Sequence, residues 1–375
     1  MSESTKIGSG AGYRQETAAQ GAGATAATSA NRILRIGVIG LGIGRSHIDG
    51  YHTHPNARVV AIADSDAARL EQQGEKYDIK GRYVDPLEMI KTEKLDIVSV
   101  CVPNKFHKDL TITALAAGCH VLCEKPMAMN AKEAQAMLDA AQKAGKRIMI
   151  DFSFRFTPQS QALKAQVDAG ILGDVYFGRT VWHRRRGMPG FGGWFSDKSL
   201  SGGGPLIDLG VHRLDLALWL MGQPEPQWVL AKTYDHLAQG IARREGKSYT
   251  VEDLASGFIT FKNGASLVVE ASWAANIKEN EFMETRLLGT QAGLVQRNVN
   301  EDYQFEAELF LEREGCQFDL KLHPPVPDSH SAMYHFVDAI LADRPHSATG
   351  QEGLYIMRLL DALYESARSG GPVSC

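Results

Sequence analysis

Short apolar segments alternate with helix-like segments in the first part of the chain, up to Asp151. The apolar runs are RILRIGVI (32–39), RVVAIAD (58–64), LDIVSVCVP (95–103), HVLCEKP (120–126) and RIMID (147–151). Segments of helical periodicity, such as AKEAQAMLDAAQKAG (131–145), separate them. Strands that are apolar throughout are typical of a parallel sheet that helices cover on both faces. We therefore predict an α/β fold with a doubly wound parallel sheet here.

After Asp151 the pattern changes to long alternating segments, such as DVYFGRTVWH (174–183) and YQFEAELFLER (303–313). In FITFKNGASLVVE (258–270), the pair Asn263-Gly264 separates two strand patterns, which is a hairpin signal. This pattern predicts an α+β domain with a large, open and mainly antiparallel sheet. We expect its helices near residues 205–221, 331–342 and 351–368.

These patterns divide the chain into three expected parts. Residues 1–31 form a flexible tail, because AAQGAGATAATSA (18–30) has too little apolar surface to offset the entropy of ordering. The alternative for this tail is an arm that wraps a partner subunit. Residues 32–152 form the first domain and residues 153–375 the second, whose last helices pack back on the first.

Composition excludes several classes of protein. The 375 residues are 44% hydrophobic and 22% charged, which is ordinary for a globular protein, and the net charge of −4 gives no basic surface for nucleic acid. No apolar run reaches the roughly 18 residues that a membrane span needs. The five cysteines form no C-x-x-C pair, so we interpret them as reduced thiols of a cytoplasmic protein.

A glycine loop, GLGIGRSH (40–47), follows the first apolar run. Glycines between a strand and a helix let backbone N–H groups approach a pyrophosphate, so Gly40, Gly42, Ile43 and Gly44 are candidates for binding a dinucleotide in a Rossmann domain. The third glycine comes one residue earlier than in G-x-G-x-x-G, which leaves open a plain turn in a protein that binds something else.

Asp64 ends the second run and supports the cofactor interpretation. An acidic side chain about 20 residues after the loop bonds the ribose hydroxyls of the adenosine. A carboxylate also repels a 2′-phosphate, and no Arg or Lys follows until Arg69. NAD is therefore favoured over NADP.

Polar residues follow two further predicted strands, at the edge where open α/β sheets bind ligands. Pro103, Asn104 and His107 follow one strand; Glu124 and Lys125 follow the next. Lys125, between a glutamate and a proline, is a candidate for the chemistry, the alternative being a solvated loop lysine. A turn and a helix cap are the alternatives for Asn104 and His107.

The segment LIDLGVHRLDLALWLMG (206–222) predicts a buried helix that carries Asp208, His212 and Asp215 on one face. Buried ionisable groups must be paired or line a cavity. Asp208 with His212 as proton acceptor therefore predicts an active site, whereas Asp215 also fits a structural ion pair. No third ligand of suitable spacing accompanies the Asp-x-x-x-His pair, so we predict no metal.

The loop WHRRRGMPGFGGWF (182–195) offers Arg184 as a clamp for an anionic group and Trp194 as a stacking surface for a sugar. A locally paired charge run and ordinary aromatic packing are the alternatives.

The chain resembles the Gfo/Idh/MocA oxidoreductases from Arg32 to its C-terminus. The resemblance rests on GLGIGRSH, VPNKFH (102–107), CEKPMA (123–128), FRFTP (154–158), GGGPLIDLGVHRLD (202–215) and VEDLASGFITFKNG (251–264). It implies NAD(P)-dependent hydride transfer on a sugar, glycoside or inositol, with Lys125 and Asp208 at the reacting hydroxyl and His212 as general acid/base. It also implies a cis peptide before Pro126, Arg155 near the nicotinamide, and a homodimer or homotetramer.

The leading hypothesis is an NAD-dependent dehydrogenase that oxidises a secondary ring hydroxyl of a carbohydrate or cyclitol. One alternative is an enzyme that retains NAD and uses transient oxidation for elimination or glycoside cleavage. A non-enzymatic NAD-dependent regulator is the other alternative, and the complete set of Lys125, Asp208 and His212 argues against it.

Overall fold

The computed structural model describes residues 32–323 and 330–375. The predicted flexible tail, residues 1–31, therefore lies outside the described residues.

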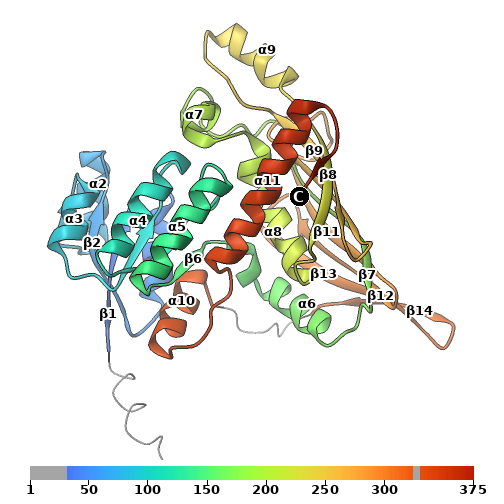
Figure 1. Cartoon of the computed structure of the whole chain (residues 1–375), viewed down its shortest axis with the longest axis horizontal. Helices are drawn as coiled ribbons and strands as arrows, with labels where there is room; N and C mark the ends of the chain where they lie inside the picture. Colours follow the sequence, from blue (N-terminus) through green and yellow to red (C-terminus); the bar gives the residue numbers. More distant parts are fainter. Residues whose placement is uncertain (1–31, 324–329) are drawn as a thin grey trace, which may run out of the picture.

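A six-stranded parallel sheet forms the first half of the structure, in the order β3-β2-β1-β4-β5-β6. Its strands are β1 (Leu34–Ile39), β2 (Ala57–Ala63), β3 (Gly81–Tyr83), β4 (Ile97–Val100), β5 (His120–Cys123) and β6 (Ile148–Ile150). The helices around it are α1 (Gly44–His52), α2 (Ala67–Lys76), α3 (Pro86–Thr92), α4 (His107–Ala116) and α5 (Ala131–Ala144) (Figure 1). The predicted doubly wound fold is confirmed.

A nine-stranded sheet dominates the second half, in the order β14-β13-β12-β11-β7-β10-β9-β8-β15. Its strands are β7 (Val175–Arg184), β8 (Pro226–Tyr234), β9 (Leu254–Phe261), β10 (Ser266–Ser272), β11 (Glu281–Gly289), β12 (Ala292–Val299), β13 (Gln304–Arg313), β14 (Cys316–Lys321) and β15 (Val373–Ser374). Only β7 and β10 pair in parallel, so the predicted mainly antiparallel sheet is confirmed. The hairpin at Asn263-Gly264 joins β9 to β10, with Gly264 at φ +89°.

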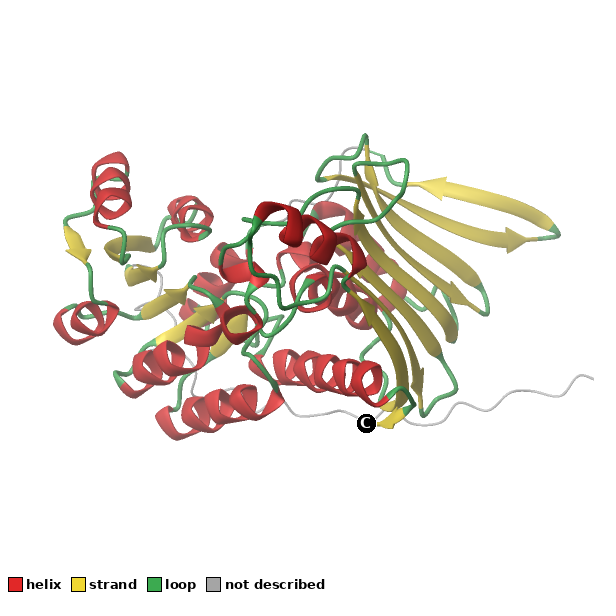
Figure 2. Cartoon of the chain, turned by 90° about the horizontal axis from the view of Figure 1, so that it is seen from above, coloured by secondary structure: helices red, strands yellow, loops and turns green. Residues whose placement is uncertain are grey.

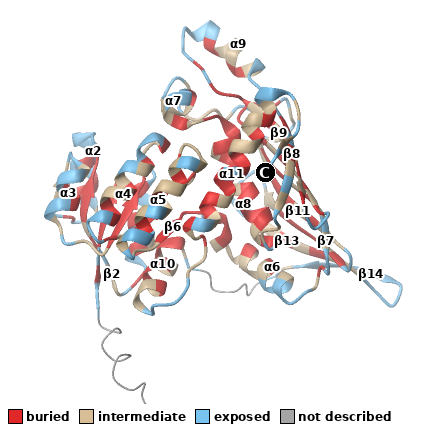
Figure 3. Cartoon of the chain, viewed as in Figure 1, coloured by how far each residue is buried: buried red, intermediate tan, exposed pale blue. Residues whose placement is uncertain are grey.

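Helices cover one face of this large sheet, and Figure 2 shows its other face without helices. The helices that contact its strands are α6 (Pro158–Asp168), α8 (Val211–Leu220) and α11 (Gly350–Ser369). The second half also contains α7 (Lys198–Ser201), α9 (His236–Glu245) and α10 (Ala332–Leu341). The two last helices reach the first half, because α10 contacts α1 and α11 contacts α5. Most of α8 is buried, and α11 buries one of its faces (Figure 3).

The segment predicted as one helix over 205–221 is two structures. A π-helical turn, η4 (Leu206–Gly210), precedes α8. Single π-helical turns of this kind are frequent at functional sites. Three short 3₁₀ segments lie elsewhere: η1 (Asn104–Phe106), η2 (Ser153–Phe156) and η3 (Trp194–Ser196). None of the helices in the described part of the chain has the length and apolar character to cross a membrane.

Candidate active site

A cavity of about 1470 Å³ lies where the carboxyl ends of the parallel strands meet the second half of the structure. Gly40, Asp64, Glu124 and Asp151 line it from the ends of β1, β2, β5 and β6. The second half contributes its own wall to the same cavity. This wall includes Trp182, Arg184, Trp194, Phe195, Asp208, His212 and Tyr303.

The glycine loop lies at the cavity, and each of its glycines has a different structural role. Gly40 has φ +86°, and a Cβ there would lie 2.2 Å from the carbonyl oxygen of Cys101, so only glycine fits. Gly42 and Ile43 line the cavity, and a Cβ on Gly42 would meet nothing within 4 Å. The backbone at Gly42 is therefore open to the close approach of a ligand.

Gly44 does not line the cavity. It begins α1, and a Cβ there would lie 2.9 Å from Cγ1 of Val38 and 3.4 Å from Cβ of Cys101. Its lack of a side chain lets the helix pack closely on β1 and β4, which is the usual task of the third glycine in dinucleotide loops. The early glycine thus keeps that packing role in a loop shortened by one residue.

Asp64 points toward the glycine loop from the end of β2. Its Oδ2 accepts a hydrogen bond from the backbone N–H of Leu41 (2.7 Å), and its Oδ1 accepts one from that of Asp66 (2.8 Å). Arg69 Nη1 donates to Oδ2 at 3.2 Å and also lines the cavity. The sequence shows Arg69 only as the first basic residue after Asp64; its contact with this carboxylate needs the helix that the structure provides.

Lys125 and Asp208 meet across the two halves of the molecule. Lys125 follows β5, before a cis peptide bond to Pro126, and its Nζ donates to Oδ1 of Asp208 (2.8 Å) and to the Asp208 carbonyl oxygen (3.0 Å). Trp273 Nε1 donates to the second carboxylate oxygen at 3.0 Å. Because both oxygens of the carboxylate are bonded, Asp208 fixes the position of the lysine ammonium at the cavity wall.

His212 lies on the first turn of α8 and is the other ionisable group at this wall. Its Nδ1 is buried without a hydrogen-bond partner, and its ring packs against Phe154 and Trp182, with ring centroids 5.0 and 5.7 Å away. Burial lowers the pKa of His212 well below 6.5, and the positive charges of Lys125, Arg213 and Arg184 lower it further. The imidazole is therefore neutral and able to accept a proton.

Of the predicted residues after β4, two line the cavity and one supports a neighbouring turn. Pro103 and Asn104 line the cavity, and Asn104 Nδ2 donates to the Ser201 carbonyl oxygen at 2.7 Å. His107 does not line it. Its two ring nitrogens lie 2.8 Å from the carbonyl oxygens of Pro126 and Val102, so it braces the turn that carries Lys125.

A buried cluster next to Lys125 combines the predicted Glu124 with His47 and Asp151, which the sequence-based predictions did not include. His47 Nε2 lies 3.0 Å from Oε1 of Glu124 and 3.3 Å from Oδ2 of Asp151. Burial alone lowers the pKa of His47, but its neighbours Cys101, Asp151 and Glu124 raise it well above 6.5. The ligand atoms of His47, Glu124 and Asp151 lie within 4.8 Å of one another and have the types found in metal sites, while the hydrogen bonds to a charged imidazole already account for the arrangement. The sequence hides this set because its members come from three separate strand or helix ends.

Arg184 and Trp194 both reach the cavity, on the side of the second sheet. Arg184 Nε donates to Oε1 of Glu281 (2.8 Å) and its Nη2 to the hydroxyl of Tyr303 (2.8 Å). Trp194 stacks on Phe195 with ring centroids 3.8 Å apart. Arg184 is thus already paired, and the wall around it is mostly aromatic.

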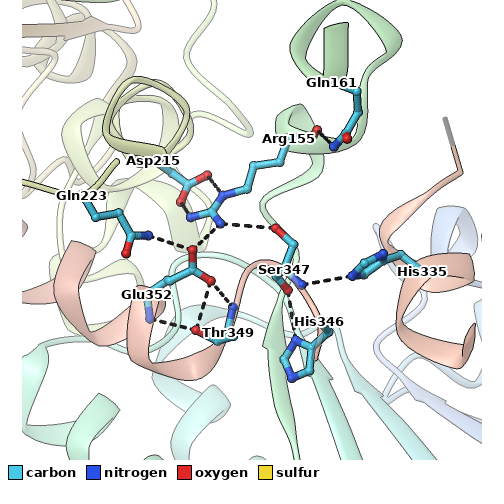
Figure 4. Close-up of polar contacts among 9 residues, drawn as sticks. All are labelled: Arg155, Gln161, Asp215, Gln223, His335, His346, Ser347, Thr349 and Glu352. Carbon is cyan, nitrogen blue, oxygen red and sulfur yellow. Dashed lines mark hydrogen bonds and ion pairs between the residues drawn. The ribbon is translucent and has the colours of Figure 1, made fainter. Parts of the chain in front are cut away.

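Arg155 is not part of this cavity, contrary to the expectation that it lies near the nicotinamide. Its side chain is 1% exposed, with Nε and Nη2 donating to Oδ2 and Oδ1 of Asp215 at 2.8 and 2.5 Å. Its Nη1 donates to Oε1 of Glu352 at 2.6 Å (Figure 4). Arg155 and Asp215 therefore form a buried ion pair that ties η2 to α8 and α11. The alternative of a structural ion pair for Asp215 is the one the structure shows.

The fold and the cavity together define an NAD-dependent oxidoreductase. Residues 34–152 match the model of an oxidoreductase family with an NAD-binding Rossmann fold. Residues 160–295 match the GFO/IDH/MocA C-terminal domain. The chain belongs to the Gfo/Idh/MocA oxidoreductase family, as its motifs predict.

Relatives align along nearly the whole chain. The D-glucoside 3-dehydrogenase of Escherichia coli (strain K12) is 36% identical over 346 residues, 90% of this chain and 96% of that protein. The myo-inositol 2-dehydrogenase of Thermotoga maritima is 31% identical over 85% of this chain and 92% of its own length. Among solved structures, the aldose-aldose oxidoreductase from Caulobacter crescentus complexed with glycerol superposes with a TM-score of 0.78 at 28% identity, covering 92% of this chain and 100% of that one.

Proposed function

We propose that this protein oxidises a secondary ring hydroxyl of a sugar or glycoside, with NAD as hydride acceptor. One observation carries the proposal: Lys125, Asp208 and His212 converge on the same cavity as the glycine loop and Asp64. NAD-dependent oxidation of an alcohol needs the dinucleotide and a proton acceptor at one place, and a fixed positive charge assists it.

The cavity residues fit the dinucleotide. The exposed backbone at Gly42 and Ile43 suits a pyrophosphate, and the carboxylate of Asp64 suits ribose hydroxyls. Asp151 Oδ1 is a buried acceptor without a partner in the same wall. We propose that Pro103, Asn104 and Glu124 contact the cofactor, because they line its side of the cavity. Gly44, His107 and Arg155 do not line the cavity and instead support the elements that form its wall.

When bound along the glycine loop and Asp64, NAD would supply the acceptor for the hydride of the carbinol carbon. The ammonium of Lys125 donates a hydrogen bond to the substrate hydroxyl oxygen and stabilises negative charge that develops on it. Neutral His212 accepts the hydroxyl proton. Asp208 holds Lys125 in place, so the two halves of the molecule must be closed on each other for the groups to meet.

The substrate class follows from the wall opposite the glycine loop and from the relatives. Trp194, Phe195 and Tyr303 offer flat apolar surfaces, and Arg184 offers hydrogen-bond donors. Such a wall suits a sugar ring with an attached aglycone or second ring better than a free cyclitol. The 36% identical relative is a D-glucoside 3-dehydrogenase, which favours a glycoside.

The test is a panel of substrates with NAD and NADP side by side. Methyl α- and β-D-glucosides, a disaccharide, D-glucose and myo-inositol are incubated with the protein, and NADH is followed by absorbance. We expect NADH with at least one glycoside, NAD preferred over NADP, and loss of activity in Lys125→Ala and His212→Ala with NAD binding retained. Full activity in both variants contradicts the proposal. Product release from a glycoside without net NADH would instead identify the retained-cofactor alternative.

We also propose the domain boundaries 32–152 and 153–375, a cytoplasmic location and a homo-oligomer. The helix-free face of the nine-stranded sheet supports the oligomer, since Leu230 on β8 is 45% exposed there beside the partly buried Trp228 and Phe258.

A further inference from the structure

Arg213, next to His212 on α8, is a buried cation with few partners. It is fully buried. Its Nη1 donates to Oε1 of Gln296 at 3.2 Å, but its Nε and Nη2 have no hydrogen-bond partner. Within the described residues no carboxylate lies in ion-pair distance of it, whereas the other deeply buried arginine, Arg155, has two. A buried cation without a charged partner destabilises the folded state, so a functional role for Arg213 would explain why it is there.

Aromatic rings surround the guanidinium of Arg213. Its Cζ lies 4.7 Å from the ring centroid of Phe154, 5.1 Å from that of Phe305 and 5.7 Å from that of Trp182. Ring faces attract the cation, yet they carry no charge that would neutralise it. Burial lowers the pKa of Arg213 to about 9, which still leaves it cationic at neutral pH.

Two of these rings also contact His212. Phe154 and Trp182, which hold the guanidinium, also pack edge-on or tilted against the imidazole. The imidazole and an unneutralised positive charge therefore share the same two buried rings. In such buried surroundings charges interact much more strongly than in water.

The other charged groups around His212 do not offset this field. Lys125 and Arg184 add positive charge from β5 and β7. Each nearby acidic group is already engaged: Asp208 with Lys125 and Trp273, Glu281 with Arg184 and Trp182, and the Tyr303 hydroxyl with Arg184. No hydrogen bond to a carboxylate supports a protonated His212, whose Nδ1 has no partner.

We propose that Arg213 is a positioning residue: its buried charge, together with the burial of His212 and the charge of Lys125, disfavours protonation of His212 and leaves the imidazole ready to accept the substrate proton. It touches neither the cavity nor the reacting atoms and acts through His212 across Phe154 and Trp182. This inference rests on the role of His212 in the proposed function, but the field of Arg213 at the imidazole exists with or without substrate.

The test measures the protonation of His212 directly. Histidine carrying a ¹³C label at Cε1 is incorporated into the protein, and the His212 resonance is assigned by its absence in His212→Asn. Its shift is followed with pH by NMR in the substrate-free protein. Arg213→Met and Arg213→Gln remove the charge, Arg213→Lys keeps it, and Arg179→Met removes an arginine that pairs with Glu270 away from His212.

We expect both neutral variants to raise the pKa of His212 by about 1 unit or more, as the loss of a nearby like charge does. Arg213→Lys and Arg179→Met leave it at the wild-type position. Thermal unfolding of Arg213→Met is expected at or above the wild-type midpoint, because an unpaired buried cation is replaced by an apolar side chain. An unchanged titration of His212 in both neutral variants overturns the proposal.

If the dehydrogenase proposal also holds, the acidic limb of kcat/KM for the best glucoside of the panel moves to higher pH in the neutral variants and returns in Arg213→Lys. A protein that oxidises none of the panel substrates but shows the NMR shift contradicts the proposed function alone. An activity loss in Arg213→Met without any shift of the limb supports a merely structural role and contradicts this inference.

Discussion

At the scale of single residues, the site depends on a neutral base beside a fixed cation. His212 is partly buried at the cavity wall among positive charges, and burial with those charges lowers its pKa well below 6.5. A base of lowered pKa remains unprotonated until the solution becomes distinctly acidic. We expect kcat/KM for a glucoside to be level around neutral pH and to fall only well below pH 6.5, as a pH profile in constant ionic strength will show. A limb at or above pH 6.5 contradicts a neutral His212.

Trp273 makes a second residue-scale prediction. Its Nε1 donates to the Asp208 oxygen that Lys125 does not use. Trp273→Phe removes a hydrogen bond to a charged group, worth about 1.5–3 kcal/mol, so kcat/KM is expected to fall about 10-fold or more. Trp228→Phe on β8, which packs against Phe258 far from Asp208, is the matched control and is expected to keep wild-type activity. Equal effects of the two substitutions would show that Trp273 does not position Asp208.

At the scale of elements, most strands and helices were predictable from the sequence. Each buries one face, and the buried face places apolar residues at a regular spacing that the sequence shows. The alternating residues of β9, for example, are buried at every second position. β3 escaped prediction because Gly81–Tyr83 is too short to show any pattern. The π turn at Leu206–Gly210 also escaped, since one extra residue per turn leaves no mark on an apolar stretch.

The candidate site was predictable where its residues follow strand ends or share a helix turn, as Lys125, Asp208 and His212 do. It was not predictable where a residue's role depends on which distant side chain it contacts. Arg155 and Asp215 are 60 residues apart, and only the packing of η2 on α8 brings them together. Trp273 and the cluster of His47, Glu124 and Asp151 likewise required the three-dimensional arrangement.

The buried ion pair between η2 and α8 gives an element-scale prediction of stability. Asp215→Ala leaves the guanidinium of Arg155 buried with Glu352 as its remaining carboxylate. Removing one partner of such a pair costs about 3–5 kcal/mol in the free energy of unfolding, measured by urea denaturation. Asp343→Ala removes the exposed partner of Arg147 and is expected to cost less than about 1 kcal/mol. A loss of under 1 kcal/mol in Asp215→Ala would contradict the role assigned to the pair.

The glycine loop allows a second comparison at this scale. Gly40 and Gly118 both have φ near +86°, but a Cβ on Gly118 meets nothing within 4 Å, whereas one on Gly40 meets the Cys101 carbonyl. Gly118→Ala is expected to cost only the backbone strain, about 1–2 kcal/mol, with NAD affinity unchanged. Gly40→Ala adds a collision and shifts the loop, so we expect a larger stability loss and weaker NAD binding by calorimetry. Unchanged NAD affinity in Gly40→Ala would contradict the proposal that this loop binds NAD.

At the scale of the whole molecule, the two halves need each other to complete the site. Lys125 comes from the parallel sheet and Asp208 with His212 from the layer on the large sheet, so the cavity between them holds both cofactor and substrate. The elements on one face of the large sheet therefore form part of the active site. The sheet's helix-free face, visible in Figure 2, is available for another task.

A row of apolar side chains crosses that face. Leu230 on β8 pairs with Phe258 on β9, and Phe258 pairs with Val268 on β10. None of the three is fully buried, and Leu230 is 45% exposed. Contiguous apolar surface of this kind marks a contact site in a water-soluble protein.

We therefore expect a homodimer or homotetramer that pairs these faces. Light scattering should give two or four times the chain mass of 41.0 kDa. Leu230→Glu places a charge at the exposed end of the row, so the mass is expected to fall toward that of one chain because charged groups resist burial in an interface. Gln72→Glu adds the same charge on exposed α2 and is expected to leave the assembly intact. The proposal that this row forms the subunit interface is contradicted if the wild-type protein is a monomer. It is also contradicted if the oligomer is unchanged in Leu230→Glu.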